Sequence, residues 1–322
     1  MERLVVRMKE VYSPNGSVAI VRPREVTARV GVMDVRGALL RLDGGGQIAY
    51  DEYGDPEGQP VIFCHGWPSS RSGARLTDAA ARKLGVRIIS PDRPGISDST
   101  FQAGRTVLDW SEIIRALAVH LALERFHILA ISGGAPYAYA TALRFPDQVI
   151  ALAVVSGAPP IAELEDHEGL LPIHRRLLAL HSRRPDLLRA LFRIVRPFAL
   201  FRPPLRSMLL HLLQPCDAAV LRDRASFDAF FESSRRAWRG SAQGVMTDGV
   251  IYAQPWGFGP EEILAPVRLW HGKKDRTFSC RLAQELAPRF PRATLRLVEE
   301  AGHYSLPIRH IEEILADLIA TG

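Results

Sequence analysis

The sequence predicts an α/β protein in which a mainly parallel β-sheet is covered by helices on both faces. Short apolar runs alternate with segments of helical spacing through residues 60–157, and the alternation resumes at 265. Such alternation is typical of parallel strands, because the crossover between two parallel neighbours is usually a helix. About a hundred residues without this alternation separate the two halves, far more than an ordinary loop, so an insertion is predicted there.

The individual elements follow from these patterns in chain order. Two short strands are predicted to flank a glycine turn within 38–54, "ALLRLDGGGQIAYDEYG". Further strands are predicted at 60–66, 86–92, 125–132, 149–157, 265–272 and 293–303, the last of which runs into a loop. Helices are predicted at 77–85, 107–123, 135–145, 279–290 and 309–320, and Gly85 is expected to close the first of them.

The chain is predicted to have three parts. Residues 1–36 form an N-terminal extension, valine-rich but broken by charges and by the turn signal "SPNG"; we expect a short hairpin or a mobile segment and assign it no role. Residues 37–157 and 263–322 form the core, and 158–262 form a helical insertion. Between 171 and 240 the insertion has 14 arginines against five acidic residues. This charge indicates either a solvated basic face or a helix lying on a membrane surface.

Composition excludes several classes of protein. The 322 residues are 47% apolar and 24% charged, which suits one large soluble domain. The net charge of +6 comes mostly from scattered arginines without a nucleic-acid-binding motif, so we predict no nucleic-acid partner. Three distant cysteines predict neither a disulfide framework nor a zinc site and fit a reducing cytoplasm. The first ten residues lack a signal-peptide core, and no apolar run could span a bilayer, so we expect a cytoplasmic protein without stable membrane insertion.

The candidate nucleophile is Ser132, in "FHILAISGGAPYAYATA". An apolar strand stops at this serine, and small residues follow it into a helix. A serine hydroxyl needs an exposed position and a nearby base to attack a substrate, and a sharp strand-to-helix turn gives that exposure. Such a turn requires small residues two positions before and after the serine, here Ala130 and Gly134. The alternative is that Ser132 is an inert helix cap.

Two backbone N–H groups are candidates for an oxyanion hole. Gly133 begins the helix after Ser132, so its N–H is expected to point at an oxyanion on the substrate. The strand at 60–66 ends in "FCHGWPSS", where a glycine lets the loop approach the serine, and the N–H of Trp67 is the second candidate donor. The alternative for this second segment is an ordinary strand-to-helix turn.

The candidate acid and base follow later strands. Asp275 lies in "LWHGKKDRTFS" and His303 in "EEAGHYSLP", each in the loop after a predicted strand. Both loops belong to the carboxyl edge of the sheet, where open α/β proteins place their sites. A histidine titrates near neutral pH, and a carboxylate orients it, so we predict His303 as base and Asp275 as its partner. Taken alone, each could be a turn aspartate or a surface histidine; the order Ser, Asp, His on post-strand loops makes the set specific.

Other candidates for these roles are weaker. His65 is expected to hold its own loop, and Asp92 in "SPDRPGISDS" to form a turn rather than to act in catalysis. His127 and His271 fall in predicted strands, His310 in the last helix, and His167, His174, His181 and His211 in the insertion. No histidine and carboxylate cluster has metal-ligand spacing, and no phosphate-binding loop occurs, so we expect neither a metal nor a cofactor.

The chain resembles the α/β-hydrolase superfamily across residues 38–320, above all bacterial serine-nucleophile, carboxylesterase-like members. The segments "HGWP", "PDRPGISDS", "ISGGAPYAYATALRFPDQV", "PVRLWHGKKD" and "EEAGHYSL" occur in that family's order, and "PWGF" stands near the end of the insertion. The resemblance implies an eight-stranded, mostly parallel sheet with a helical cap over the site. It also implies Ser132 as nucleophile, Asp275 as acid, His303 as base, and Trp67 and Gly133 as oxyanion donors. Ala130 departs from the glycine that the nucleophile motif most often has.

The residue at the nucleophile position favours one reaction class. Relatives that open epoxides or remove halide have an aspartate there, whereas a serine suits acyl transfer. We therefore predict a serine esterase that cleaves small to medium apolar carboxylic esters through an acyl-enzyme. Its partner is a small-molecule ester, and a homodimer is left open. The alternatives are another reaction of the same residues, such as C–C bond or lactone hydrolysis, a lyase or an acyltransferase, or a ligand-binding protein of this fold.

Overall fold

The computed structural model describes residues 36–200 and 210–321. The hairpin or mobile segment predicted for 1–36 therefore lies outside the described residues except for Arg36. Within the described part of the chain, no helix is both long and apolar enough to cross a membrane.

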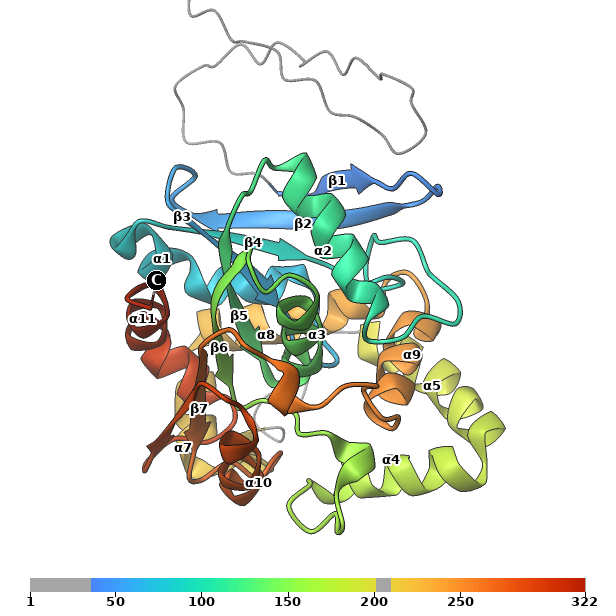
Figure 1. The fold of residues 1–322 in the computed structure, drawn as a ribbon. Helices are drawn as coiled ribbons and strands as arrows, with labels where there is room; N and C mark the ends of the chain where they lie inside the picture. Colours follow the sequence, from blue (N-terminus) through green and yellow to red (C-terminus); the bar gives the residue numbers. More distant parts are fainter. Residues whose placement is uncertain (1–35, 201–209, 322) are drawn as a thin grey trace, which may run out of the picture. The chain divides into compact units, whose positions relative to one another are not determined.

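The centre of the fold is one eight-stranded sheet with the order β1-β2-β4-β3-β5-β6-β7-β8 (Figure 1). The strands are β1 (Ala38–Arg41), β2 (Gln47–Gly54), β3 (Gln59–Cys64), β4 (Val86–Pro91), β5 (Phe126–Ile131), β6 (Val149–Val155), β7 (Val267–Gly272) and β8 (Ala293–Val298). Strand β2 is antiparallel to both of its neighbours, β1 and β4, and every other pair is parallel. The predicted eight-stranded, mostly parallel sheet is confirmed.

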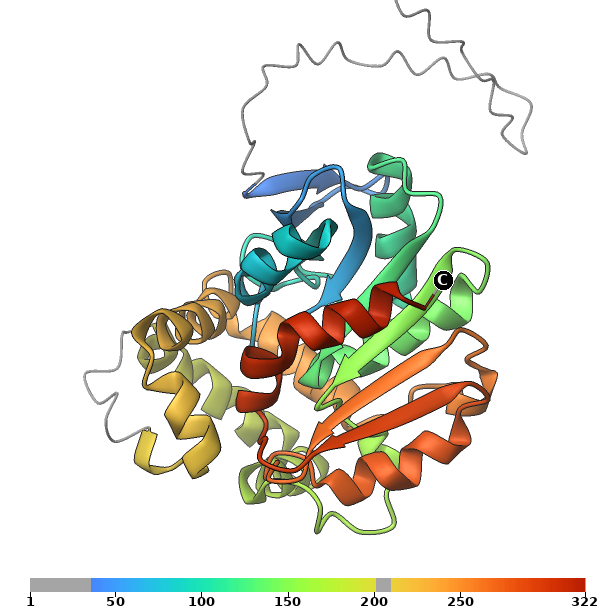
Figure 2. The same ribbon diagram turned by 90° about the vertical axis from the view of Figure 1, so that its left-hand side faces the viewer.

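Helices cover both faces of this sheet, as predicted (Figure 2). The core helices are α1 (Asp78–Leu84), α2 (Asp109–His120), α3 (Ala135–Arg144), α10 (Cys280–Leu286) and α11 (Ser305–Ile319). Neighbouring residues of a strand point to opposite faces, so Ile88 packs with α1 and α11 while Ile89 packs with α2 and α3. Because both faces are covered, central strands such as β5 and β6 are apolar along nearly their whole length.

The ends of two helices show how local sequence sets the element boundaries. Gly85 has a φ of 63° and closes α1, as expected, because this left-handed conformation costs glycine little. The helix predicted at 279–290 is shorter than expected. Its α-helical part ends at Leu286, and the 3-10 turn η5 (Ala287–Arg289) follows, since Pro288 has no N–H to continue the helical hydrogen bonds.

The described part of 158–262 is mainly helical and lies between β6 and β7 in the chain. Its elements are η3 (Ile161–Glu163), α4 (Pro172–Arg183), α5 (Pro185–Leu200), α7 (Pro215–Leu221), α8 (Arg224–Ala237), α9 (Ala242–Tyr252) and η4 (Pro260–Glu262). Two further 3-10 turns belong to the core: η1 (Arg71–Thr77) and η2 (Ser132–Gly134). The division of the chain into a core and a separate cap domain stays a prediction.

Candidate active site

The three residues predicted as nucleophile, acid and base lie together at the carboxyl edge of the sheet. Ser132 follows β5, Asp275 follows β7 and His303 follows β8. The His303 Nδ1 lies 2.8 Å from the Asp275 Oδ2, and the His303 Nε2 lies 3.0 Å from the Ser132 Oγ. An ionised carboxylate can only accept, so Nδ1 carries the ring proton and Nε2 is free to accept from the serine hydroxyl. The arrangement can remove a proton from Ser132.

The backbone around Ser132 makes the sharp turn that the small residues predicted. Ser132 has a φ of 55°, a left-handed conformation that is uncommon for a residue with a side chain. Gly134 is required by close approach: a Cβ there would lie 2.0 Å from the carbonyl oxygen of Cys64 at the end of β3. Ala130 is completely buried in β5, where its single methyl group is accommodated. The turn thus tolerates a methyl group before the serine but none after it.

Backbone N–H groups hold the Asp275 carboxylate in place. Its Oδ1 accepts hydrogen bonds from the N–H of Thr277, at 2.7 Å, and of Phe278, at 3.1 Å. Burial opposes ionisation of Asp275, but the charge and hydrogen bond of His303 outweigh it, so the pKa of Asp275 is lowered. The carboxylate is therefore charged at neutral pH and can stabilise a protonated His303.

His303 is held by a second carboxylate that the sequence did not indicate. Asp217 of α7 is buried and accepts hydrogen bonds from the N–H groups of His303, Tyr304 and Ser305, at 3.1, 3.1 and 2.8 Å. Burial of His303 disfavours its charged form, but the charges of Asp275 and Asp217 outweigh burial, so the pKa of His303 is raised. No motif surrounds Asp217 in "QPCDAAV", and only its contacts reveal it.

The two predicted oxyanion donors lie beside each other and beside Ser132. A Cβ on Gly133 would lie 3.0 Å from the Trp67 Cβ, and a Cβ on Gly66 would lie 3.4 Å from the Ser132 Cβ. The loop after β3 therefore reaches the turn after β5, as the glycine in "HGWP" predicted. The role of the Trp67 and Gly133 N–H groups as donors to an oxyanion stays a prediction.

Buried polar contacts join α9 to these same loops. Arg93 donates to the carbonyl oxygens of His65 and Gly66, at 2.6 and 2.8 Å, and to Asp248 of α9 at 2.8 Å. Asp248 also pairs with Arg105 and accepts a hydrogen bond of 3.0 Å from the Tyr137 hydroxyl. One buried carboxylate thus pairs with two buried guanidinium groups and links the loop of Trp67 to the insertion.

Tyr252 of α9 makes a third link between the insertion and the candidate site. Its hydroxyl donates a 2.7 Å hydrogen bond to the carbonyl oxygen of Gly133. A Cβ on Gly133 would lie only 2.6 Å from this hydroxyl, which gives a further reason for glycine at this position. Together with Asp217, Tyr252 places described residues of the insertion in direct contact with the loops of His303 and Ser132.

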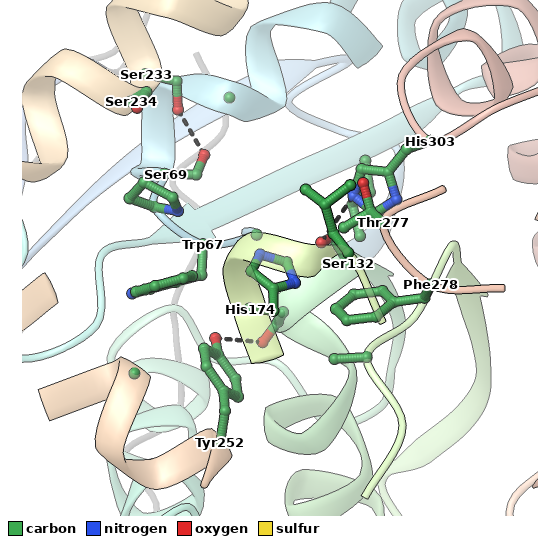
Figure 3. A pocket seen from close by; sticks show the side chains of 18 of the residues that line it. Trp67, Ser69, Ser132, His174, Ser233, Ser234, Tyr252, Thr277, Phe278 and His303 are labelled. Carbon is green, nitrogen blue, oxygen red and sulfur yellow. Dashed lines mark hydrogen bonds between the residues drawn. The ribbon is translucent and has the colours of Figure 1, made fainter. Parts of the chain in front are cut away.

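A cavity of about 350 Å³ opens onto Ser132 and His303 (Figure 3). Its walls are mostly apolar and come from both the core and the insertion, as in Trp67, Phe192 and Phe278. His174 of α4 also lines it and lies close to Phe278 (Figure 3). Burial, and then the nearby charge of His303, lower the pKa of His174 to about 4. The cavity is therefore suited to an uncharged, apolar group next to the serine.

The arginines and other candidates lie away from this cavity. No arginine or lysine is among the described residues that line it, so the basic insertion does not offer a site for an acidic group there. Asp92 is not the turn residue that we expected, because it is fully buried and pairs with Arg71. In 36–200 and 210–321 no three potential metal ligands cluster, and the expectation of no cofactor stays a prediction.

Comparison with known proteins places the chain among hydrolases. Residues 61–317 match the model of the alpha/beta hydrolase family. An uncharacterized hydrolase of Bacillus subtilis is 30% identical over 124 residues, which are 38% of this chain and 42% of that protein. A non-heme chloroperoxidase of Streptomyces lividans is 31% identical over 132 residues, which are 40% of this chain and 48% of that protein. The aligned segments thus span less than half the length of these curated relatives.

Solved structures with the same fold include a carboxylesterase of the thaumarchaeon Nitrososphaera gargenis. The two chains are 19% identical, and the superposition covers 88% of this chain and 98% of the other with a TM-score of 0.64. At this identity the likeness concerns the fold alone.

Proposed function

Because the chain belongs to the alpha/beta hydrolase family, we propose that it is a serine esterase acting on small to medium apolar carboxylic esters. Ser132 is the nucleophile, His303 the general base and Asp275 the residue that orients and stabilises the imidazole. The observation that carries the proposal is the hydrogen-bonded chain from Asp275 through His303 to Ser132, with both contacts within 3.0 Å.

The reaction follows from the positions of these atoms. His303 Nε2 takes the hydroxyl proton while the Ser132 Oγ attacks the ester carbonyl carbon. The backbone N–H groups of Trp67 and Gly133 bind the oxyanion, each contributing about 2.7–4 kcal/mol to the transition state. His303 then gives its proton to the departing alcohol, and an acyl-enzyme forms on Ser132. A water molecule, deprotonated by the same histidine, releases the acid and restores the serine.

The cavity supports uncharged, apolar substrates. The described residues that line it include many aliphatic and aromatic side chains, but no acidic or basic side chain apart from the histidines. The pKa of His174 is lowered to about 4, so this side chain is neutral at pH 7 and adds no charge. An apolar acyl or alkyl group gains free energy on leaving water for such a cavity, whereas a carboxylate or ammonium group would lose its hydration.

The test removes the proposed nucleophile. Ser132→Ala is expected to lower kcat on p-nitrophenyl butyrate by on the order of 10³–10⁶, with an unchanged circular dichroism spectrum. Ser234→Ala is the matched control, because Ser234 lines the same cavity but has no hydrogen bond to His303 in the structure. A fluorophosphonate probe is expected to label the wild type and the Ser234→Ala variant but not Ser132→Ala.

The outcomes separate the alternatives. Near wild-type turnover by folded Ser132→Ala would reject Ser132 as nucleophile. Labelling of Ser132 without hydrolysis of any short ester would point to another reaction of the same residues, such as C–C bond or lactone hydrolysis, a lyase or an acyltransferase. If the probe does not label Ser132 and no short ester is hydrolysed, the result would point to a ligand-binding protein.

A further inference from the structure

The outer surface of α4 and α5 combines exposed apolar side chains with a high density of arginine. We name this surface the α4–α5 face. Its exposed apolar members are Ile173, Leu187, Leu191, Ile194, Val195 and Phe198, and its exposed arginines are Arg175, Arg176, Arg183, Arg184, Arg189 and Arg193. The two helices contact each other and lie next to each other in Figure 1.

The apolar side chains of α5 form one stripe. They occur at 187, 191, 194, 195 and 198, a spacing that places them within about one third of the helix circumference. Phe198 is 74% exposed, Ile194 64% and Leu187 52%, whereas Leu188 and Phe192 on the inner side are buried. Large apolar side chains gathered this way on a surface commonly mark a site of interaction. The stripe therefore needs a partner that offers apolar surface.

The charge of these two helices is unusually concentrated. Residues 172–200 have seven arginines and one acidic residue, a net charge of +6, which equals the net charge of the whole chain. The remaining residues thus have 34 basic and 34 acidic side chains. No described acidic side chain pairs with Arg175, Arg176, Arg183, Arg184 or Arg193, and Arg189 pairs only with the exposed Asp186. The partner must therefore be anionic as well as apolar.

The charge of the α4–α5 face argues against a second copy of the chain, or another segment of this chain, as its partner. A two-fold dimer through this face would bring two strongly positive surfaces together. The chain segments outside the described residues do not offer a net negative charge, since 1–35 has a net charge of +2 and 201–209 of +2. A nucleic acid would match the arginines but not the apolar stripe. An anionic lipid bilayer matches both, because its headgroups are negative and its acyl region is apolar.

We propose that the α4–α5 face docks on the surface of an anionic lipid bilayer. The stripe of α5 enters the boundary between headgroups and acyl chains, and the exposed arginines of α4 contact the phosphates. The inner sides of the same helices line the cavity through Leu177, Leu178, Leu188 and Phe192. Docking therefore brings the roof of the cavity to the lipid surface, where an apolar substrate is concentrated.

The test is binding of the full-length chain to vesicles, which does not depend on the proposed esterase activity. Wild type is expected to sediment with phosphatidylglycerol/phosphatidylcholine vesicles at low salt. It is expected not to sediment with phosphatidylcholine vesicles, nor at about 1 M salt, where screening shortens the electrostatic range to about 3 Å. The triple variant Arg176→Gln/Arg183→Gln/Arg184→Gln is expected to lose about fivefold in affinity per arginine, on the order of 100-fold in total.

Matched controls separate the face from general charge and hydrophobicity. Arg75→Gln/Arg125→Gln/Arg292→Gln removes the same charge from exposed arginines elsewhere and is expected to bind like wild type. Ile194→Ser/Phe198→Ser is expected to weaken binding at least tenfold, by removing the two most exposed members of the apolar stripe. Val119→Ser, which changes a residue of α2 that is 74% exposed, is the control for it.

Several results would overturn the proposal. One is a wild-type protein that does not bind anionic vesicles at low salt. Another is equal binding of the two triple arginine variants to these vesicles. A third is a concentration-dependent dimer that Ile194→Ser/Phe198→Ser dissociates without any vesicle binding, which would assign the face to a second copy. A fourth is salt-sensitive retention on DNA in place of vesicle binding. Hydrolysis of soluble p-nitrophenyl esters by all these variants would show that the proposed function stands regardless of the docking result.

Discussion

Two carboxylates act on His303, the proposed base for Ser132. Asp275 fixes the ring proton on Nδ1, and Asp217 holds the backbone of the loop that carries the histidine. Both negative charges favour the protonated imidazole, so the pKa of His303 is raised despite its burial. The histidine is thereby a stronger base than it would be alone, but it must first lose its proton.

The pH dependence of activity follows from that raised pKa. Only neutral His303 can accept the serine proton, so kcat/KM is expected to fall as the pH drops through its pKa. Because the pKa of His303 is raised, the midpoint of this acidic limb is expected above 6.5, the ordinary value for a histidine. Measuring kcat/KM for p-nitrophenyl butyrate from pH 5 to about 9 tests this, and a flat profile would count against His303 as the base.

Asp217→Asn tests the second carboxylate. The change removes one negative charge near His303, so the acidic limb of kcat/KM is expected to move to lower pH. It also replaces two oxygens that accept from the loop by one, so kcat at the optimum is expected to fall on the order of 10- to 100-fold through misplacement of the imidazole. Asp228→Asn, at an exposed aspartate of α8, is the control. A lower kcat with an unmoved limb would limit Asp217 to a structural role.

At the scale of elements, the site depends on how closely the strand ends approach one another. The turn after β5 touches the end of β3 so closely that residue 134 can have no side chain. Helix α9 then fastens the insertion to this region through Asp248 and Tyr252. The insertion is therefore joined to the candidate site by buried polar contacts as well as by apolar packing, and its removal would leave those groups without partners.

Asp248→Asn tests that attachment. The variant leaves Arg93 and Arg105 buried without a countercharge, so the free energy of unfolding is expected to fall by about 3–5 kcal/mol. Urea denaturation followed by circular dichroism measures the change. The exposed pair of Asp228 with Arg224 is the contrast: Asp228→Asn is expected to lower the free energy of unfolding by about 1 kcal/mol or less. Equal effects of the two variants would contradict the proposed importance of the buried network.

For the whole molecule, the sheet and the described part of the insertion have different tasks. The sheet brings Ser132, Asp275 and His303 together, while the insertion supplies much of the cavity wall, including Phe192 of α5 and Tyr252 of α9. In the proposed function, the chemistry thus belongs to the loops of the sheet and the choice of substrate to the insertion. Changes in the insertion are expected to alter which ester is preferred more than how the ester is cleaved.

The size of the cavity predicts a limit on the acyl chain. With about 350 Å³ available, short and medium p-nitrophenyl esters are expected to give the highest kcat/KM, and the palmitate ester a much lower one. Phe192→Ala enlarges the cavity and is expected to shift the optimum to longer chains. Rates that rise steadily from acetate to palmitate in the wild type would contradict an enclosed site.

The sequence by itself determined the fold class and the members of the candidate triad. Apolar runs alternating with amphipathic segments specify a parallel sheet, and such a sheet gathers the loops after its strands at one edge. Ser132, Asp275 and His303 each follow a strand, so their approach could be inferred although 171 residues separate Ser132 from His303.

Only the tertiary structure decided the supporting contacts, the cavity and the exposed α4–α5 face. Asp217 accepts a hydrogen bond from Ser305 although 88 residues separate them in the sequence, and Arg93 donates one to Asp248 over a separation of 155. Neither pair lies in a motif or shares a periodic pattern. Residues at the ends of parallel strands meet because of the topology of the sheet, but partners on inserted helices are chosen by packing, which local sequence does not encode.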